Sequence, residues 1–196
     1  TGNVEDVAGQ LTLWGQGRRL TDLQAALARV QLRRLPSIVA AMRRSHAAFE
    51  AHLAGRGLAT RTHETPGGEG HTGGFVAFRL PDAGDDDAQL ALGRAVAADL
   101  LAGGLLAVFL HDFEVHVHYN VPQLVGRLDL PGGCNWSCPR AAQGAAFRRY
   151  GRGTLACLDA ALAQTVMFWV PSLLDRRLEA DACRLLDEVL DRHLPR

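Results

Sequence analysis

The sequence predicts an α+β fold: a small, mostly antiparallel sheet with helices on one face, preceded by a long N-terminal helix. Two observations predict this class. Short apolar segments bounded by Gly or Pro alternate with amphipathic segments, and the first and longest amphipathic segment has no strand before it. The 196 residues are 47% hydrophobic and 21% charged, which is an ordinary globular composition and suffices to bury a core.

A long helix is predicted over residues 21–53. Thr21 and Gln24 form a capping box, because a Thr at the helix start is followed three residues later by Gln. Helical spacing is then kept by Leu23, Leu27, Val30, Gln31, Arg34, Ile38 and Met42. Pro36 predicts a kink or a break at Leu35. Left alone, this helix would expose much of its apolar stripe, so we expect it to have a partner.

Strands are predicted where short apolar or alternating segments occur, most of them bounded by Pro or Gly at one end or both. These segments are residues 74–80, 105–110, 115–119 and 166–170. In the third of them Val and Tyr alternate with His116 and His118, so the two histidines are expected on the same face of a strand.

Three further helices are predicted from acidic starts and apolar spacing, over residues 85–101, near 155–163 and over 178–194. Residues 120–152 contain prolines and glycines with little periodicity and predict a long loop, which is uncommon in a compact domain unless it is functional. We expect residues 1–58 to form an N-terminal segment with a long interface helix, and residues 59–196 to form one small α+β domain.

The charged residues restrict the reactions and the binding partners that we expect for this chain. All 21 basic residues are Arg, none is Lys, and 21 acidic residues balance them. The chain therefore has no side-chain amine for a Schiff base or for a lysine general base. A neutral chain is not suited to broad binding of nucleic acid or of an anionic membrane. No apolar run reaches a membrane span, no signal segment is recognisable, and four cysteines are too few for a disulfide scaffold, so we expect a cytoplasmic protein.

Residues 15–27, with the sequence GQGRRLTDLQAAL, resemble the segment G-x-N-x-R-M-(T/S)-(E/D)-L-Q-A-A-L of the DegT/StrS sugar aminotransferases. These are pyridoxal 5'-phosphate (PLP) enzymes of fold type I. Residues 31–35 resemble the family's Q-L-x-x-L step on the long interdomain helix, and residues 159–171 resemble its late helix and Pro-ended strand. The resemblance extends over most of the chain and is sharp over residues 15–35.

The resemblance implies that two parts of the enzyme have different roles. In the family, a large N-terminal domain carries PLP on a lysine, whereas this chain resembles only the C-terminal small domain and the interdomain helix. The family's Asn in G-x-N-x-R reaches the phosphate of PLP in the neighbouring subunit. Gly17 stands at that position here. Gly17 (through its N–H), Arg18 and Arg19 are therefore the candidate cofactor-binding residues, although the two arginines also fit a solvated surface.

A second set of residues, His111, Asp112, Glu114, His116 and His118, precedes the predicted loop. A His-x-His pair on one strand face can bind a metal, with Asp112 or Glu114 as a third ligand, or it can line a polar cavity. The resemblance places this stretch near the substrate pocket, and we expect His116, His118 and Tyr119 to contact substrate rather than a metal. The basic run from Arg148 to Arg152 fits either an anionic pocket or a solvated loop.

Three functions fit these observations. The first is the small subunit of a heterodimeric or larger PLP-dependent enzyme of specialised (natural product) metabolism, acting on a small-molecule substrate. A lysine-bearing, aminotransferase-like large subunit would then bind PLP covalently. The second is a noncatalytic scaffolding or binding subunit of the same origin. The third is an independent metal-binding protein that uses His116 and His118.

Overall fold

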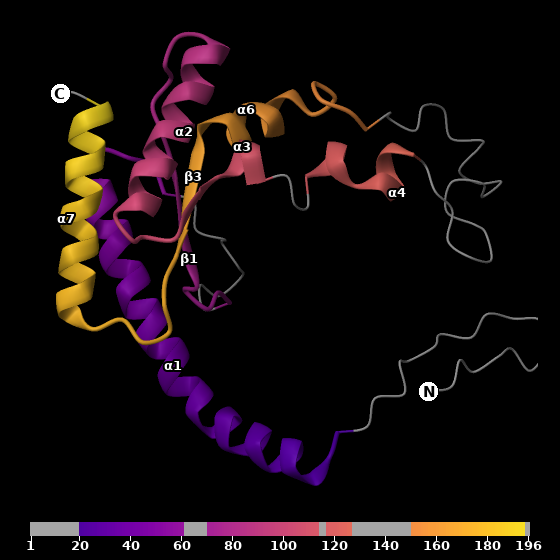
Figure 1. Ribbon diagram of the computed structural model, residues 1–196, viewed down its shortest axis with the longest axis vertical. Coiled ribbons are helices and arrows are strands. Elements are labelled where there is room, and N and C mark those ends of the chain that lie inside the picture. The colour runs from indigo at the N-terminus through magenta and orange to yellow at the C-terminus, as the bar shows by residue number, and fades with distance from the viewer. Residues whose placement is uncertain (1–19, 61–69, 114–116, 127–149, 195–196) are drawn as a thin grey trace, which may run out of the picture. The chain divides into compact units, whose positions relative to one another are not determined.

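The computed structural model describes residues 20–60, 70–113, 117–126 and 150–194 (Figure 1). It confirms the α+β class, with a long N-terminal helix α1 (Asp22–Gly55) and a three-stranded antiparallel sheet. The chain divides into two compact units. The larger unit comprises Leu32–Glu114 and Ala156–Arg196, and the smaller comprises Thr1–Gln31 and Val115–Leu155. The predicted domain boundary at residue 58 stays a prediction.

The sheet has the strand order β1-β3-β2, with β1 (Phe75–Arg79) and β2 (Ala107–Phe109) both antiparallel to β3 (Thr165–Trp169). Phe168 lies opposite both Val76 and Ala107 in the register. Because side chains alternate along a strand, this register places one apolar row of each strand on a common face.

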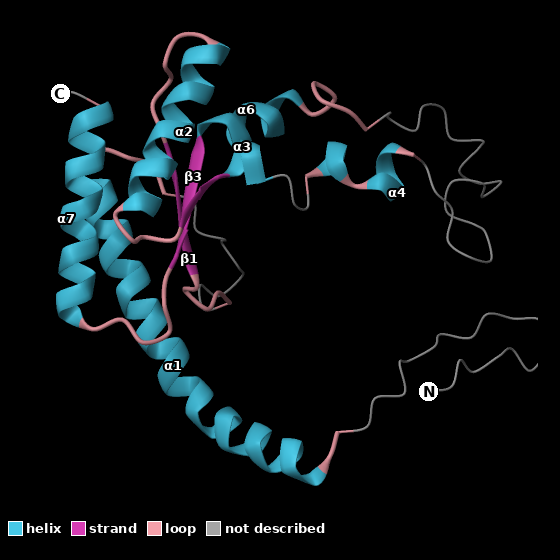
Figure 2. Ribbon diagram, in the orientation of Figure 1, coloured by secondary structure: helices cyan, strands magenta, loops and turns pink. Residues whose placement is uncertain are grey.

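Helices cover that face of the sheet. Figure 2 shows α1, α2 (Asp86–Ala102) and α7 (Arg176–His193) together beside the strands. The core contains side chains of all three helices and all three strands: Phe49, Leu53, Val76, Phe78, Val96, Leu100, Ala107, Phe109, Val166, Phe168, Leu186, Val189 and Leu190. At its centre the Phe49 and Phe168 rings meet edge to face at 5.2 Å. The predicted placement of the helices on one face is confirmed.

Helix caps agree with the sequence signals. The N–H of Gln24 donates to Thr21 Oγ1 at 3.2 Å, and the N–H of Thr21 donates to Gln24 Oε1 at 3.0 Å, so the predicted capping box is formed. Asp85 caps α2 by accepting from the Ala88 N–H at 2.8 Å. Asp175 likewise accepts from the N–H groups of residues 177 and 178 at the start of α7.

Helix α1 runs through Pro36 without interruption, so the predicted break at Leu35 is wrong, whereas the alternative of a kink there stays a prediction. A proline within a helix removes one backbone hydrogen bond, here the bond to the Leu32 carbonyl. Leu32 and Pro36 are both exposed, so water can solvate that carbonyl. Ser37 also donates from Oγ to the Arg34 carbonyl at 2.7 Å within the same turn.

The strand predicted at residues 115–119 is wrong over its described part. A 3-10 helix, η1 (His118–Asn120), follows Val117, and α4 (Pro122–Val125) follows η1. The Asn120 N–H donates to the Val117 carbonyl at 2.8 Å, which closes the turn. The predicted long loop at 120–152 is therefore helical where it begins. The described residues also form two short helices, α3 (Leu110–Phe113) and α6 (Ala156–Gln164).

Candidate functional site

The predicted site residues fall into two groups. Gly17, Arg18, Arg19 and His116 lie outside the described residues. His118 and Tyr119 are described, and both belong to the smaller unit. The structure places them beside Tyr150 and Arg152, which are 31 or more residues further along the chain. We call His118, Tyr119, Tyr150 and Arg152 the His118 cluster.

His118 is the buried member of this cluster, with 8% of its surface exposed. Its Nε2 lies 3.2 Å from the Gly151 carbonyl oxygen. A carbonyl only accepts hydrogen bonds, so this contact requires a proton on Nε2 and makes Nδ1 the acceptor nitrogen of the neutral ring. The same carbonyl accepts from the Thr154 N–H at 3.1 Å. The turn at Gly151 therefore fixes both the tautomer and the orientation of the imidazole.

The aromatic rings of the cluster lie around His118. The Tyr119 ring meets the imidazole edge to face at 5.0 Å, and the Tyr150 ring does so at 6.4 Å. Arg152 places its guanidinium carbon 4.6 Å from the centroid of the Tyr119 ring. Such a cation–π pair contributes about 0.5–1 kcal/mol at an exposed position. Stacking on the ring orients a guanidinium, whose planar set of N–H donors matches a carboxylate or a phosphate.

Tyr150 and Arg152 were not predicted as partners of Tyr119. The sequence shows them only as part of a basic run that also fits a solvated loop. Their contacts with His118 and Tyr119 are tertiary, so no periodicity along the chain reveals them. The one available signal is local: Tyr150, Gly151 and Gly153 interrupt the arginines, and Gly153 adopts a positive φ of 80°.

The described residues do not support the prediction of a metal-binding His-x-His pair on one strand face. His118 lies in η1, so it is not on a strand face, while Glu114 and His116 lie outside the described residues. Asp112 accepts from Arg94 Nε at 2.6 Å and lies 2.8 Å from His111 Nδ1. The hydrogen bond from Arg94 lowers the pKa of the Asp112 carboxyl. Among the residues that the structure describes, no three His, Cys, Asp or Glu side chains are arranged to hold a metal ion.

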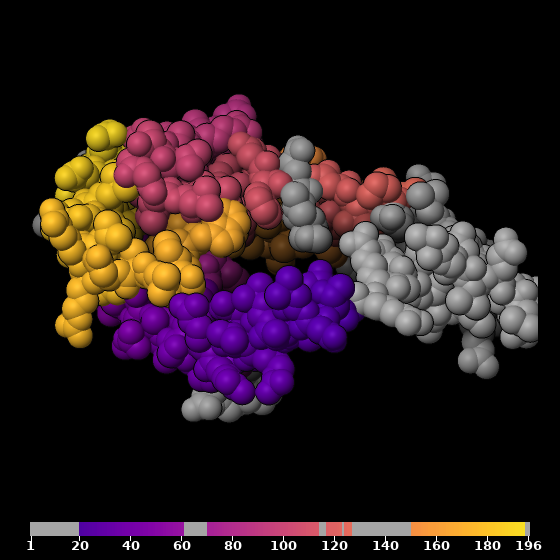
Figure 3. Space-filling view, turned by 60° about the horizontal axis from the view of Figure 1, so that its bottom comes forward, coloured from indigo at the N-terminus to yellow at the C-terminus, as the bar shows by residue number. Residues whose placement is uncertain are grey.

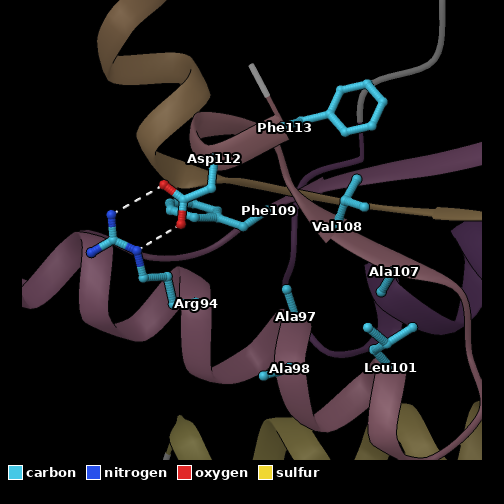
Figure 4. A pocket seen from close by; sticks show the side chains of 9 residues that line it. All are labelled: Arg94, Ala97, Ala98, Leu101, Ala107, Val108, Phe109, Asp112 and Phe113. Carbon is cyan, nitrogen blue, oxygen red and sulfur yellow. Dashed lines mark hydrogen bonds and ion pairs between the residues drawn. The ribbon is translucent and has the colours of Figure 1, made fainter. Parts of the chain in front are cut away.

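A shallow pocket of about 310 Å³ lies beside this ion pair in the larger unit (Figure 4). Arg94 of α2 and Asp112 of α3 face each other at its edge, joined by two hydrogen bonds. Its other lining residues are apolar: Ala97, Ala98, Leu101, Ala107, Val108, Phe109 and Phe113. Because Arg94 and Asp112 neutralise each other, the pocket offers an apolar surface with no uncompensated charge to orient a polar substrate.

Covalent attachment of PLP is outside the chemistry of this chain. PLP enzymes bind the cofactor through a lysine Schiff base, and the sequence has no lysine. The described residues therefore do not provide the covalent site of the cofactor.

Part of the chain matches a known protein family. The model of the DegT/DnrJ/EryC1/StrS aminotransferase family matches residues 3–92. The match covers slightly less than half of the 196 residues and confirms the resemblance seen at residues 15–35. The family is PLP-dependent, and the match indicates an aminotransferase-like protein. A search of curated proteins found no match. None of the described helices has the length and apolar character needed to cross a membrane.

Proposed function

We propose that this chain is the small subunit of a heteromeric PLP-dependent, aminotransferase-like enzyme, and that a lysine-bearing large subunit completes the active site. One observation carries the proposal. The chain matches a PLP-dependent family over residues 3–92, yet none of its 196 residues is lysine. Since the chemistry of that family depends on a lysine, the lysine must be supplied by another domain.

The roles of the two subunits follow from their residues. The large subunit binds PLP covalently and supplies the acid–base lysine; when bound, PLP supplies the electron sink for amino transfer. This chain contributes Gly17, Arg18 and Arg19 toward the cofactor phosphate. It contributes the His118 cluster, with His116, toward the substrate. We infer a keto-sugar or cyclitol substrate of specialised metabolism, and we propose that Arg152, stacked on Tyr119, binds an anionic substituent on it.

The proposal is tested by complementation. The chain and the lysine-bearing, aminotransferase-like protein encoded nearest to it are expressed separately and mixed, and amino transfer from an amino-acid donor is measured. We expect activity only in the mixture. Activity of the large subunit alone, unchanged when this chain is added, would contradict the proposal. A native polypeptide whose mass includes a lysine-bearing domain would contradict the division into separate subunits.

The substrate role of the His118 cluster has its own test in the same mixture. Replacing Arg152→Gln removes the guanidinium stacked on Tyr119, and we expect KM for an anionic acceptor to rise about tenfold, the loss of roughly one charge-assisted hydrogen bond. Arg177→Gln, a change of the same type at an exposed position of α7, serves as the control and should leave KM unchanged. Equal KM values for the two variants would remove Arg152 from the site.

A noncatalytic scaffolding role is the second candidate, and Gly17 favours it. The family's Asn side chain at this position reaches the phosphate, and glycine has no such donor. Under this alternative the mixture is active, but replacement of Arg18, Arg19 and His118 together leaves kcat and KM unchanged. Loss of activity in that triple variant, with the complex still formed, would exclude scaffolding as the whole function.

A further inference from the structure

Two hydrogen bonds between Gly151 and Thr154 close a turn in the segment that carries Tyr150 and Arg152. The Gly151 N–H donates to Thr154 Oγ1 at 3.1 Å, and the Thr154 N–H donates to the Gly151 carbonyl at 3.1 Å. Between them Gly153 adopts a positive φ of 80°, a conformation that side chains disfavour. Thr154 therefore closes the turn with its hydroxyl as well as with its backbone.

This turn makes the contacts that hold the His118 cluster together. The Tyr150 ring meets the His118 ring at 6.4 Å, and the Gly151 carbonyl lies 3.2 Å from His118 Nε2. Arg152 lies over the Tyr119 ring at 4.6 Å. Because the three contacting residues of the turn are consecutive, the backbone conformation of the turn sets the spacing of all three contacts. A change of that conformation would therefore move the guanidinium relative to Tyr119.

Arg152 is the member of the cluster that a dissolved ligand can reach most readily. It is exposed and Tyr119 is partly exposed, whereas His118 is only 8% exposed. Part of the surface of residues 117–126, in red-orange, is visible on the face that Figure 3 shows. Ordering an exposed side chain when a ligand binds costs conformational entropy. A turn that already holds Arg152 on Tyr119 lowers this cost for a ligand that uses the guanidinium.

We propose that Thr154 is a positioning residue of the substrate site, which holds the turn so that Arg152 selects acceptors bearing an oxyanion over uncharged ones. The oxyanion is a carboxylate or a phosphate, because the planar N–H donors of a guanidinium match both. An uncharged acceptor gains little from an ordered guanidinium, so the turn acts on selectivity rather than on binding in general. This inference rests on the proposed function and names the residue that sets the substrate class.

The test measures binding of three probes to the complex with the large subunit by calorimetry: glucose 6-phosphate, glucuronate and glucose. For the wild-type complex we expect at least one anionic probe to bind about tenfold more tightly than glucose. Thr154→Val keeps the shape of the side chain but removes its hydroxyl. In this variant we expect Kd for the anionic probe to rise about fivefold, with Kd for glucose unchanged.

Three further variants show whether the turn is responsible. Thr154→Ser retains a hydroxyl and should restore the wild-type Kd. Gly153→Ala should reproduce the loss of selectivity through the backbone alone, because its Cβ would meet no atom within 4 Å while its positive φ is strained for alanine. Thr72→Val, the same change at an exposed residue of the larger unit, is the control and should leave every Kd unchanged.

The tautomer of His118 gives a second readout that needs no large subunit. In the wild-type chain we expect the neutral ring to carry its proton on Nε2, which donates to the Gly151 carbonyl. In Thr154→Val this carbonyl is held less firmly, so we expect the Nε2-protonated tautomer to lose population. Nitrogen chemical shifts of the imidazole, assigned by comparison with His118→Gln, measure it. A general loss of stability would leave the tautomer of the folded chain unchanged.

The outcomes separate this inference from the proposed function. If Arg152→Gln raises Kd for the anionic probes and Thr154→Val does not, the positioning role is overturned and Arg152 stays in the substrate site. Equal Kd values of the wild-type complex for all three probes would overturn the inference together with the anion-binding role of Arg152, but not the division into two subunits. An unchanged His118 tautomer in Thr154→Val would overturn the positioning role even if no complex forms.

Discussion

His46 shows at the residue scale how burial sets a protonation state. It lies on α1 with 5% of its surface exposed, and its Nδ1 is 3.3 Å from Glu50 Oε2. The His71 ring lies 4.8 Å away, and Arg43 Nε donates to the His71 carbonyl at 2.8 Å. Burial lowers the pKa of His46 and outweighs the attraction of Glu50, while His71 adds a smaller lowering effect. The imidazole is therefore neutral in the folded protein at pH 7.

This lowered pKa predicts a pH dependence of stability. Because the unfolded chain binds a proton at His46 more readily than the folded chain does, the contribution of His46 is fully present above about pH 6.5. It is lost as pH falls from there toward the lower pKa of the folded state, by at most about 1.4 kcal/mol per pH unit. Urea titrations at pH values between 7.5 and 5 measure this loss as the difference in the free energy of unfolding between the wild-type chain and His46→Gln. A difference that is constant over this range would contradict the account.

At the scale of elements, the close packing of α2 against the sheet explains why residue 93 is a glycine. Gly93 lies within α2, where alanine would ordinarily be preferred by about 1 kcal/mol. A Cβ atom built on Gly93 would clash with the ring of Phe109, which belongs to β2 and to the core. The absence of a side chain at Gly93 therefore allows α2 to approach the sheet closely.

Replacement of this glycine should destabilise the protein. Overpacking costs about 1–3 kcal/mol and outweighs the helix preference of alanine, so we expect Gly93→Ala to lower the free energy of unfolding by roughly 1–2 kcal/mol. Gly55→Ala at the end of α1 is the control, because no atom lies within 4 Å of its built Cβ. Denaturant titration compares the two variants. Unchanged or increased stability of Gly93→Ala would show that Phe109 can move at no cost.

Comparison of the elements shows what the sequence can predict. Each strand of the described residues lies within or close to a segment that Gly or Pro bounds at one end or both, and local sequence therefore located all three. The alternation at residues 115–119 was misleading because alternation alone does not supply a neighbouring strand, and the described part of this stretch forms a turn. The prediction of a break at Leu35 was wrong because a solvated helix tolerates one missing hydrogen bond. Arg152 was missed as a partner of Tyr119 because their contact is tertiary.

At the scale of the whole molecule, the chain matches a PLP-dependent family but has no lysine. The family matched over residues 3–92 is PLP-dependent, and the 196 residues lack the lysine on which that chemistry depends. These facts are reconciled if the catalytic lysine lies on another domain and this chain completes the site.

The most direct measurement of this central claim locates the cofactor. The complex with the large subunit is reduced with borohydride, which fixes PLP to its lysine, and each polypeptide is weighed and mapped by mass spectrometry. The account predicts PLP on one lysine of the large subunit, none on this chain, and one copy of this chain for each PLP. A large subunit that holds PLP and is fully active with no copy of this chain bound would contradict it.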